Sequence, residues 1–386
     1  MAAGRTRVVA GLGAAQTLAW ASSYYLPALL ARPMAAELGV SVPTVFAAFS
    51  AALVVSALAG PQAGRVIDRW GGRPLLMATS VLFALGLAAL ALAGGTVGLF
   101  AAWLVMGVAM GSGLYEAAFA ALVRLYGHDA RGAITGITLI AGFASTVGWP
   151  LTAALQQAWG WRGACWGWAA LHLLLGLPLN AWLPRVPALP SPAEAPAPAA
   201  VAAAPPTATA ALLAWVFAVT WFISTAMAAH LPGLLAVAGA TPAAVVAFSA
   251  LVGPAQVGGR LLEFGLLQRW HPLLSARLAA LAHPLGAALL AVLGAPAVAA
   301  FALLHGAGNG ILTIAKGTLP LALFGPAGYG QRQGLLMLPA RLGQALSPWL
   351  FGLLLDELGA GALWCSAGLA LSALAALLLI RLPPPS

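Results

Sequence analysis

Three polar residues interrupt one long apolar stretch of the chain. His305, Asn309 and Lys316 are four and seven residues apart, so they share one face of a helix. A histidine takes up and releases a proton near neutral pH, and a lysine ammonium can hold an anion. Each also has a structural interpretation, since His305 could be a packing residue, Asn309 could join two helices, and Lys316 could extend to the membrane surface. This face is a candidate site for a solute or a proton.

Other apolar stretches carry polar groups of the same kind. Ionisable groups are costly inside a bilayer and by default mark a pathway, a proton relay or a partner. Glu116 could carry a proton or contact the solute, or it could neutralise Lys316 or Arg341. Arg341 could hold a carboxylate through two hydrogen bonds, or it could belong to an intracellular gate. The candidate residues for substrate binding or proton coupling are Gln16, Trp20, Tyr24, Glu116, Trp221, His305, Asn309, Lys316 and Arg341.

The composition identifies the elements that must position these groups. Of the 386 residues, 62% are hydrophobic and only 6% are charged, whereas soluble domains carry about 25% charged residues. About twenty apolar residues cross a bilayer roughly 30 Å thick, and only helices and closed barrels satisfy their backbone there. Barrel strands would alternate in hydropathy, but runs such as 82–92 are uninterrupted. The chain is predicted to be an all-α polytopic membrane protein.

Twelve helical spans can be placed along the chain. They are expected at about 8–30, 43–63, 75–94, 98–123, 133–157, 163–183, 210–230, 243–262, 273–293, 297–321, 334–355 and 361–380. A segment rich in proline and alanine, residues 184–209, is typical of a semi-rigid linker. We therefore expect a six-helix bundle over 1–183, a cytoplasmic linker, and a second six-helix bundle over 210–386.

The positive charges indicate the orientation. If the N-terminus is cytoplasmic, 15 of the 17 Lys and Arg residues fall at the cytoplasmic ends or loops, and only Arg32 and Arg162 do not. Three of the fifteen, Arg260, Lys316 and Arg341, lie within the spans, and the bias expected of cytoplasmic loops remains without them. The net charge of +9 is then a topology signal and not a sign of nucleic-acid binding. Arginine is used everywhere except at Lys316, which suggests a GC-rich bacterial genome. We expect both termini to be cytoplasmic, in a bacterial inner membrane.

The two halves show a faint internal repeat. The sequence Ala-Phe-Ser-Ala at 48–51 recurs at 247–250. The pattern Gly-Arg-x-x-Asp at 64–68 is echoed by Gly-Arg-x-x-Glu at 259–263. Together these matches favour two pseudo-symmetric halves of the same topology.

The most charged segment of the chain is the turn after the second predicted span, residues 64–76. Four of its thirteen residues are charged, and it joins two apolar runs. It resembles the signature loop of the major facilitator superfamily, although Gly72 stands where a basic residue is often found. The matching positions are Gly64, Asp68, Arg69, Gly71, Arg73 and Leu76.

This resemblance implies a solute transporter in which two six-helix halves rock about a central cavity. The first, fourth, seventh and tenth spans would line that cavity. The loop would lock the inner ends of the halves in the outward-facing state. Asp68 should then meet the start of the eleventh span, or basic residues such as Arg124 and Arg131, within a network that includes Arg69 and Arg73. The gating residues implied in this way are Gly64, Asp68, Arg69, Gly71, Arg73, Arg260 and Glu263; the alternative is a solvated turn that only enforces topology.

Two departures from the family's patterns argue against a typical multidrug exporter. Trp103 stands four residues before Gly107, where proton-driven antiporters usually have an arginine. The fifth span has only Gly148-Trp149-Pro150 in place of the glycine-proline motif of drug antiporters. No HExxH sequence, Cys/His pair or phosphate loop is present, so we expect neither an enzyme nor a metal or other cofactor.

The sequence therefore predicts a secondary active transporter for a small solute. Basic and aromatic groups facing the cavity favour a small organic anion such as a monocarboxylate, moved by alternating access with proton coupling. One alternative is a proton-antiport exporter of a toxic solute, drug or oxyanion. Another is a sensor or assembly factor on the same fold that transports nothing. The expected partners are the solute, protons and the lipid bilayer, and a monomer is expected.

Overall fold

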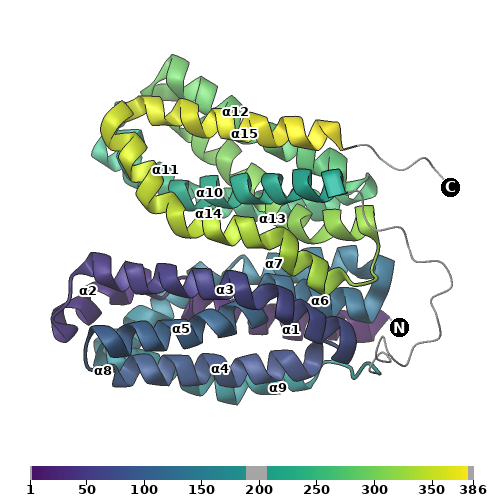
Figure 1. The fold of residues 1–386 in the computed structure, drawn as a ribbon. Helices are drawn as coiled ribbons and strands as arrows, with labels where there is room; N and C mark the ends of the chain where they lie inside the picture. The colour runs from purple at the N-terminus through teal and green to yellow at the C-terminus, as the bar shows by residue number, and fades with distance from the viewer. Residues whose placement is uncertain (1, 188–206, 381–386) are drawn as a thin grey trace. The chain divides into compact units, whose positions relative to one another are not determined.

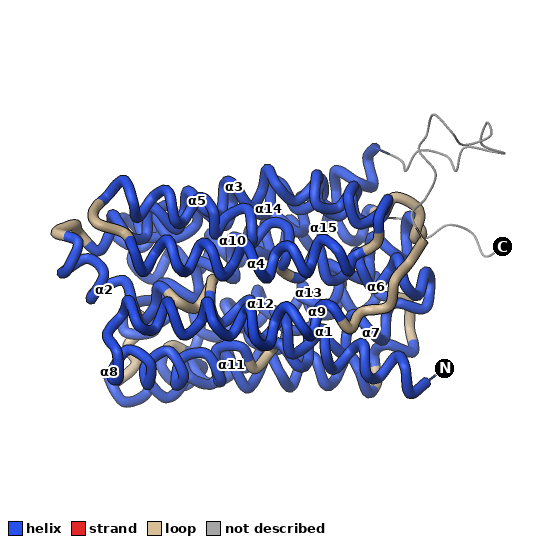
Figure 2. Tube along the Cα trace, turned by 90° about the horizontal axis from the view of Figure 1, so that it is seen from below, coloured by secondary structure: helices blue, strands red, loops and turns tan. Residues whose placement is uncertain are grey.

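The computed structural model describes residues 2–187 and 207–380, and in these ranges it contains helices and no strand (Figures 1 and 2). The helices are α1 (Ala2–Ser22), α2 (Pro27–Leu38), α3 (Val42–Trp70), α4 (Gly72–Leu92), α5 (Thr96–Gly113), α6 (Tyr115–Tyr126), α7 (Ala130–Ala141), α8 (Ala144–Leu171), α9 (Leu177–Ala181), α10 (Thr207–Val237), α11 (Pro242–Gly265), α12 (Pro272–Leu293), α13 (Val298–Phe324), α14 (Tyr329–Leu358) and α15 (Ala362–Leu379). Five short 3₁₀ or π turns complete the order: Gly127–Asp129, His172–Gly176, Leu267–Arg269, Ala295–Ala297 and Gly359–Gly361. The predicted all-α fold is confirmed.

Each of the twelve predicted spans overlaps one helix or a run of consecutive helices. Among the described residues, seven stretches are long and apolar enough to cross a membrane. Two of them, Thr96–Ala181 and Tyr329–Leu379, run through several helices. Most of the long helices therefore have the membrane-spanning character expected from composition, while α1 and α11 are not among the seven stretches.

Some predicted spans are interrupted or extended. The first, expected at 8–30, breaks after Ser22 and resumes at Pro27, from which α2 continues to Leu38. Proline has no N–H and a fixed φ, so it is tolerated at the first helical position and favours a new start there. The fourth span is broken at Leu114, whose backbone is extended (φ −84°, ψ −164°). Glu116 follows directly after this break.

The described residues form two compact units. The first comprises residues up to 187 together with 325–338, and the second comprises 207–324 together with 339–380. Most of the predicted linker, residues 184–209, lies outside the described residues. The structure thus differs from the expected halves in one respect, because the beginning of α14 packs with the first unit.

Glycines hold the helices of both units close together. A Cβ atom added to Gly107 or Gly111 of α5 would lie 2.5 Å from a main-chain oxygen of α3. A Cβ added to Gly306 or Gly310 of α13 would lie 2.7 or 2.2 Å from a main-chain oxygen of α11. Paired small residues four apart permit such contact between membrane helices. The two pairs are 199 positions apart, as are the two Ala-Phe-Ser-Ala segments, so the internal repeat extends to helix packing.

Candidate functional site

Two cations of the second unit approach the same aromatic ring. The Nζ atom of Lys316 on α13 lies 3.7 Å from the ring centroid of Trp221 on α10. The guanidinium carbon of Arg341 on α14 lies 5.1 Å from the same ring. Lys316 is 4% exposed, Trp221 is 8% exposed and Arg341 is 3% exposed. The structure therefore brings three of the predicted site residues together, and we call them the cation cluster.

Arg341 also contacts a buried amide, and two acidic residues of the unit lie far along the same helix. Arg341 donates a hydrogen bond of 3.0 Å to the side-chain oxygen of Gln344, one turn along α14. Among the described residues of the second unit the acidic side chains are Glu263, Asp356 and Glu357. Asp356 and Glu357 are exposed near the far end of α14, about four turns from Arg341. The cluster thus places two buried cations beside one aromatic ring in the interior of this unit.

A chain of hydrogen bonds joins three helices of the second unit, and one of them, α13, also carries Lys316. Nδ1 of His305 on α13 lies 3.0 Å from Nδ1 of His283 on α12. Nε2 of His283 lies 3.1 Å from Oγ of Ser366 on α15. His283 is not among the site residues predicted from the sequence, yet its side chain is 7% exposed and packs on Phe301. Its position in the middle of the predicted span 273–293 is the signal that could have identified it.

Asn309 joins two helices, as its structural interpretation predicted, and it also lines a pocket. Its Nδ2 donates a hydrogen bond of 3.0 Å to Oγ of Ser224 on α10, which joins the two helices. A pocket between α10, α12, α13 and α15 is lined by Asn309 and Ser224 together with Thr220, His283 and His305. The remaining lining is apolar.

In the first unit, the predicted residues of α1 lie among aromatic rings. Trp20 contacts Tyr24 at a centroid distance of 5.4 Å and Tyr115 at 4.9 Å. Gln16 is 2% exposed and donates a 2.7 Å hydrogen bond from Nε2 to the carbonyl oxygen of Gly113, at the break of the fourth span. Its Oε1 is buried without a hydrogen-bond partner among the described residues. These residues line the interior of the unit, and their role in binding stays a prediction.

Two residues of the fourth span have distinct environments. Trp103, which replaces the arginine of antiporters, is fully buried and packs edge-on against Phe49 at 5.2 Å. Glu116 lies in the first turn of α6, where the helix dipole favours a negative charge. Its carboxylate interacts electrostatically with Tyr329, the first residue of α14. Pairing of Glu116 with the cations of the second unit stays a prediction.

The carboxylate of Asp68 caps the beginning of α14. Oδ1 accepts a 2.8 Å hydrogen bond from the main-chain N–H of Gly330, and Oδ2 accepts one of 2.9 Å from that of Gln331. The first N–H groups of a helix have no partner within the helix, so Asp68 supplies the missing acceptors. Arg124 donates from Nε to the main-chain oxygen of Asp68 at 3.2 Å, and Arg332 attracts the carboxylate. The contact with the eleventh span that the resemblance implied is present.

Glycines of the same loop permit this contact. A Cβ added to Gly64 would lie 2.0 Å from the carbonyl oxygen of Gly330. Gly71 has φ +81°, which favours glycine in the turn between α3 and α4. A Cβ added to Gly72 would lie 2.1 Å from the Cβ of Ala121. That close packing explains why glycine occupies a position where a basic residue is common.

The expected network with Arg69 and Arg73 is not found. Among the described residues the carboxylate of Asp68 bonds to main-chain N–H groups and to neither arginine. Arg69 instead lies over the ring of Trp70 at 4.9 Å. Asp68 and Arg69 are adjacent on α3, so their side chains leave the helix about 100° apart. In the second unit, Arg260 and Glu263 are 6% and 2% exposed within α11. Both side chains are thus buried on one face of α11, and their gating role stays a prediction.

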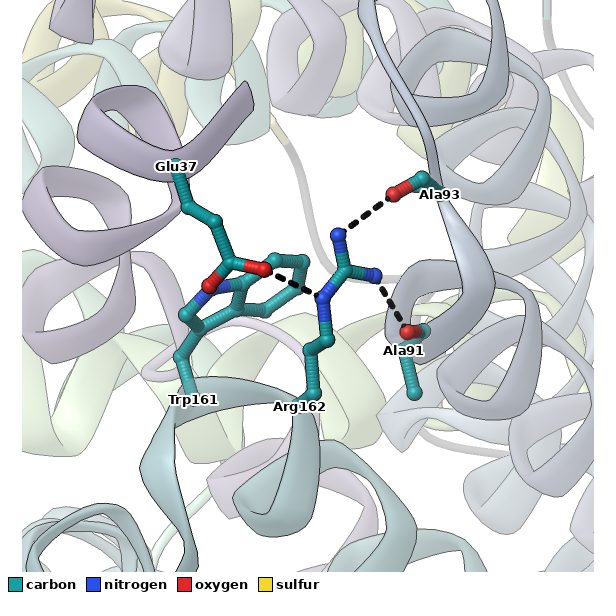
Figure 3. Close-up of polar contacts among 5 residues, drawn as sticks. All are labelled: Glu37, Ala91, Ala93, Trp161 and Arg162. Atoms are coloured by element: carbon teal, nitrogen blue, oxygen red, sulfur yellow. Dashed lines mark hydrogen bonds and ion pairs between the residues drawn. The ribbon is translucent and has the colours of Figure 1, made fainter. Parts of the chain in front are cut away.

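A polar contact that the sequence did not reveal joins three helices of the first unit (Figure 3). Nε of Arg162 on α8 donates a 2.7 Å hydrogen bond to the carboxylate of Glu37 at the end of α2. The same guanidinium donates to the main-chain oxygens of Ala91 and Ala93 at the end of α4. Trp161 donates to the second carboxylate oxygen. Glu37 is distant in sequence from Trp161 and Arg162, so local spacing does not indicate this contact.

The Glu37 contact predicts a pH-dependent contribution to stability. The hydrogen bond from Arg162 and then that from Trp161 hold the pKa of Glu37 below its ordinary value of 4.5. The contribution is therefore complete above that value and is lost as the pH falls through the lower pKa of the folded state. We expect Glu37→Gln to lower the melting temperature at neutral pH and to have a diminishing effect in acid. Thermal unfolding of the purified protein measures this, with the exposed Glu357→Gln as control; a difference that does not change with pH would contradict it.

Comparison with known sequences extends over most of the chain. The sequence profile of the Major Facilitator Superfamily matches residues 12–304. A curated relative, an uncharacterized 38 kDa protein in the 23S RNA operon of Thermoproteus tenax, is 33% identical over 153 residues. That match covers 39% of this chain and spans 40% of the relative's length.

Solved structures with the same fold cover nearly the whole chain. The human organic anion transporter MFSD10 (TETRAN) has a TM-score of 0.73 at 18% identity, covering 97% of this chain and 98% of that one. The proton:xylose symporter XylE, bound to 6-bromo-6-deoxy-D-glucose, has 0.74 at 12% identity, covering 97% and 95%. The transporter FucP in the outward conformation has 0.71 at 15% identity, covering 96% and 97%.

Proposed function

Since the chain belongs to the major facilitator superfamily and is a multi-pass membrane transporter, we propose that it carries a small organic anion coupled to protons. The observation that supports this most directly is the cation cluster of Lys316, Arg341 and Trp221. The proposed cargo is a monocarboxylate or a similar small oxyanion. The proposed location is a bacterial cytoplasmic membrane, with both termini cytoplasmic and the protein a monomer.

The chemistry of the cluster suits a carboxylate with an organic body. A guanidinium presents two parallel N–H groups that match the two oxygens of a carboxylate, and an ammonium adds a compact point charge. A carboxylate bound here would accept hydrogen bonds from both cations. The indole of Trp221 stabilises both cations through its ring face and offers an apolar surface to the solute.

The fold comparison is compatible with this cargo and adds no residue role. One neighbour is described as an organic anion transporter and another as a proton symporter, so the fold accommodates both an anion and proton coupling. Their low identity with this chain shows the fold alone. The proposal for this protein therefore depends on its own cation cluster.

The remaining site residues have proposed roles in the transport cycle. Glu116 and His305 are proposed to bind the coupled proton, because protonation of either changes the free-energy difference between conformational states. Asp68, through its bonds to the first turn of α14, is proposed to stabilise one of these states as part of a gate. Arg260 and Glu263 are proposed to act in the corresponding gate of the second half.

Uptake into proteoliposomes tests the proposal. The purified protein is reconstituted, and a panel of radiolabelled carboxylates is offered with an alkaline interior, with equal pH, and with the reverse gradient. Accumulation of a carboxylate only with the alkaline interior supports proton-coupled import. Accumulation only in the reverse gradient would instead show exchange for protons, as in an exporter. Absence of carboxylate movement in all three conditions would overturn the proposed cargo.

A further inference from the structure

The two buried histidines of the second unit form a hydrogen-bonded pair apart from the cation cluster. His283 and His305 lie on adjacent helices with their Nδ1 atoms 3.0 Å apart. Two N–H groups cannot face each other at this distance, so one Nδ1 donates and the other accepts. The hydrogen bonds around the pair decide which one donates.

Ser366 assigns the proton positions. Its hydroxyl donates to the main-chain oxygen of Leu363 at 2.8 Å, which uses the only proton that the hydroxyl has. Oγ of Ser366 therefore accepts from His283, and Nε2 of His283 carries a hydrogen. A neutral His283 then has a lone pair on Nδ1, which accepts from Nδ1–H of His305. This network leaves a lone pair on Nε2 of His305.

Nε2 of His305 can accept one further proton without breaking the hydrogen bonds from His305 to His283 and from His283 to Ser366. The site therefore binds one proton. Nε2 of His305 has no hydrogen-bond partner among residues 2–187 and 207–380. Protonation there retains the Nδ1–H bond to His283, which shares the new charge. A second proton on Nδ1 of His283 would place two N–H groups head to head.

The adjoining pocket has polar groups in its wall and room for water. His283 and His305 both line it, together with Thr220, Ser224 and Asn309. The volume open to the centres of water molecules is about 30 Å³, which gives room for about two waters. Hydroxyl and amide groups in the wall supply the partners that buried waters need. The pocket can therefore hydrate a proton acceptor.

Two of the titratable side chains on the surrounding helices, Arg277 and His230, are held by main-chain oxygens. The titratable groups on the helices packed around the pair are Arg260 and Glu263 of α11, Arg277 of α12, Lys316 of α13, His230 of α10 and Cys365 of α15. Arg277 is bound by the main-chain oxygens of Leu377 and Ile380, and His230 by that of Pro348.

We infer that His283 and His305 form one proton-binding site, which takes a single proton on Nε2 of His305 from water in the pocket. His283 is the positioning residue, and Ser366 holds its tautomer. The inference rests on the proposed proton coupling and names its site. Lys316 is eleven residues from His305 on α13, about 16 Å along the helix. The proton and the anion thus occupy separate sites on shared helices, and binding at one changes affinity at the other reciprocally.

Transport measurements with matched variants test the inference. For one proton moved with one monoanion, a pH difference of one unit supports about tenfold accumulation. We expect His305→Gln and His283→Asn to lose this accumulation while retaining exchange of labelled for unlabelled anion at equal pH. The control is His172→Asn, which replaces a buried histidine of the first unit that bonds to Ser22. It should retain both activities, and full accumulation by His305→Gln would overturn the inference.

A second measurement decides the question even if no carboxylate is transported. ¹⁵N spectra of the full-length protein with labelled histidine rings report tautomer and charge, and the two variants assign the signals. We expect neutral His283 to carry hydrogen on Nε2, and the pair to titrate in one step at Nε2 of His305. Hydrogen on Nδ1 of His283, or two independent steps, would overturn the proton site. Failure of wild-type uptake with this spectroscopic result would overturn only the proposed cargo.

Discussion

Replacing Arg341 by alanine should weaken the binding of a carboxylate about 10- to 150-fold, since hydrogen bonds to charged groups contribute about 1.5–3 kcal/mol. The guanidinium is 3% exposed and faces Trp221 beside Lys316, so the anion would lose its bidentate partner in a buried site. The affinity is measured by isothermal titration or by the concentration dependence of uptake. Arg341→Lys should recover only part of it, because an ammonium lacks the two parallel donors.

Arg277 provides the matched control for this experiment. It is an arginine of the same unit, but its guanidinium bonds to main-chain oxygens at the end of α15. Arg277→Ala should reduce thermal stability and leave the affinity for the anion unchanged. An unchanged affinity in Arg341→Ala, with a folded protein and a wild type that binds, would contradict the assigned role of the cluster.

Replacing Gly64 by alanine should separate α3 from the first turn of α14. The new Cβ would lie 2.0 Å from the carbonyl oxygen of Gly330 and 2.6 Å from the nitrogen of Gln331, and main-chain atoms cannot rotate away. Overpacking of this kind costs about 1–3 kcal/mol. We expect a lower melting temperature and faster hydrogen–deuterium exchange of the Gly330 and Gln331 amides, which lose Asp68 as acceptor.

The neighbouring Gly60 tests whether the effect is specific. It lies one turn earlier on α3, and its added Cβ would meet only the Cα of Gly334 at 3.9 Å, an ordinary contact. Gly60→Ala should therefore behave like the wild type. Asp68→Asn, which keeps the packing but removes the charge, should raise the exchange of the same amides with a smaller loss of stability. Wild-type protection in Gly64→Ala would show that the contact does not depend on this glycine.

The elements and the loop were accessible from the sequence because their signals are local. Uninterrupted apolar runs such as 82–92 indicate membrane helices wherever they occur. The spacing of Gly64, Asp68 and Gly71 is a short-range pattern, and it led to the contact of Asp68 with the eleventh span. The partners of the carboxylate were less predictable, since main-chain N–H groups at a helix start carry no sequence signature. Arg69 and Arg73 were therefore expected as partners instead.

The polar sites depended on long-range packing. Trp221, Lys316 and Arg341 come from three helices separated by many residues, and nothing in their spacing shows that both cations face one ring. His283 was passed over because its partners, His305 and Ser366, lie on other helices. Similarly, Glu37 and Arg162 are 125 positions apart. Such pairs become visible only when helices are placed side by side.

By itself, the sequence determined an all-α membrane protein with an internal repeat and a facilitator-type loop, because hydropathy and short motifs act within one helix or one turn. Tertiary structure alone decided which polar side chains meet: the cation cluster on Trp221, the two-histidine chain to Ser366, and the capping of α14 by Asp68. The physical reason is that a buried charge or imidazole is stabilised by whichever groups the neighbouring helices present. Helix packing sets those neighbours through glycine contacts, such as that of Gly107 of α5 with α3 and that of Gly306 of α13 with α11.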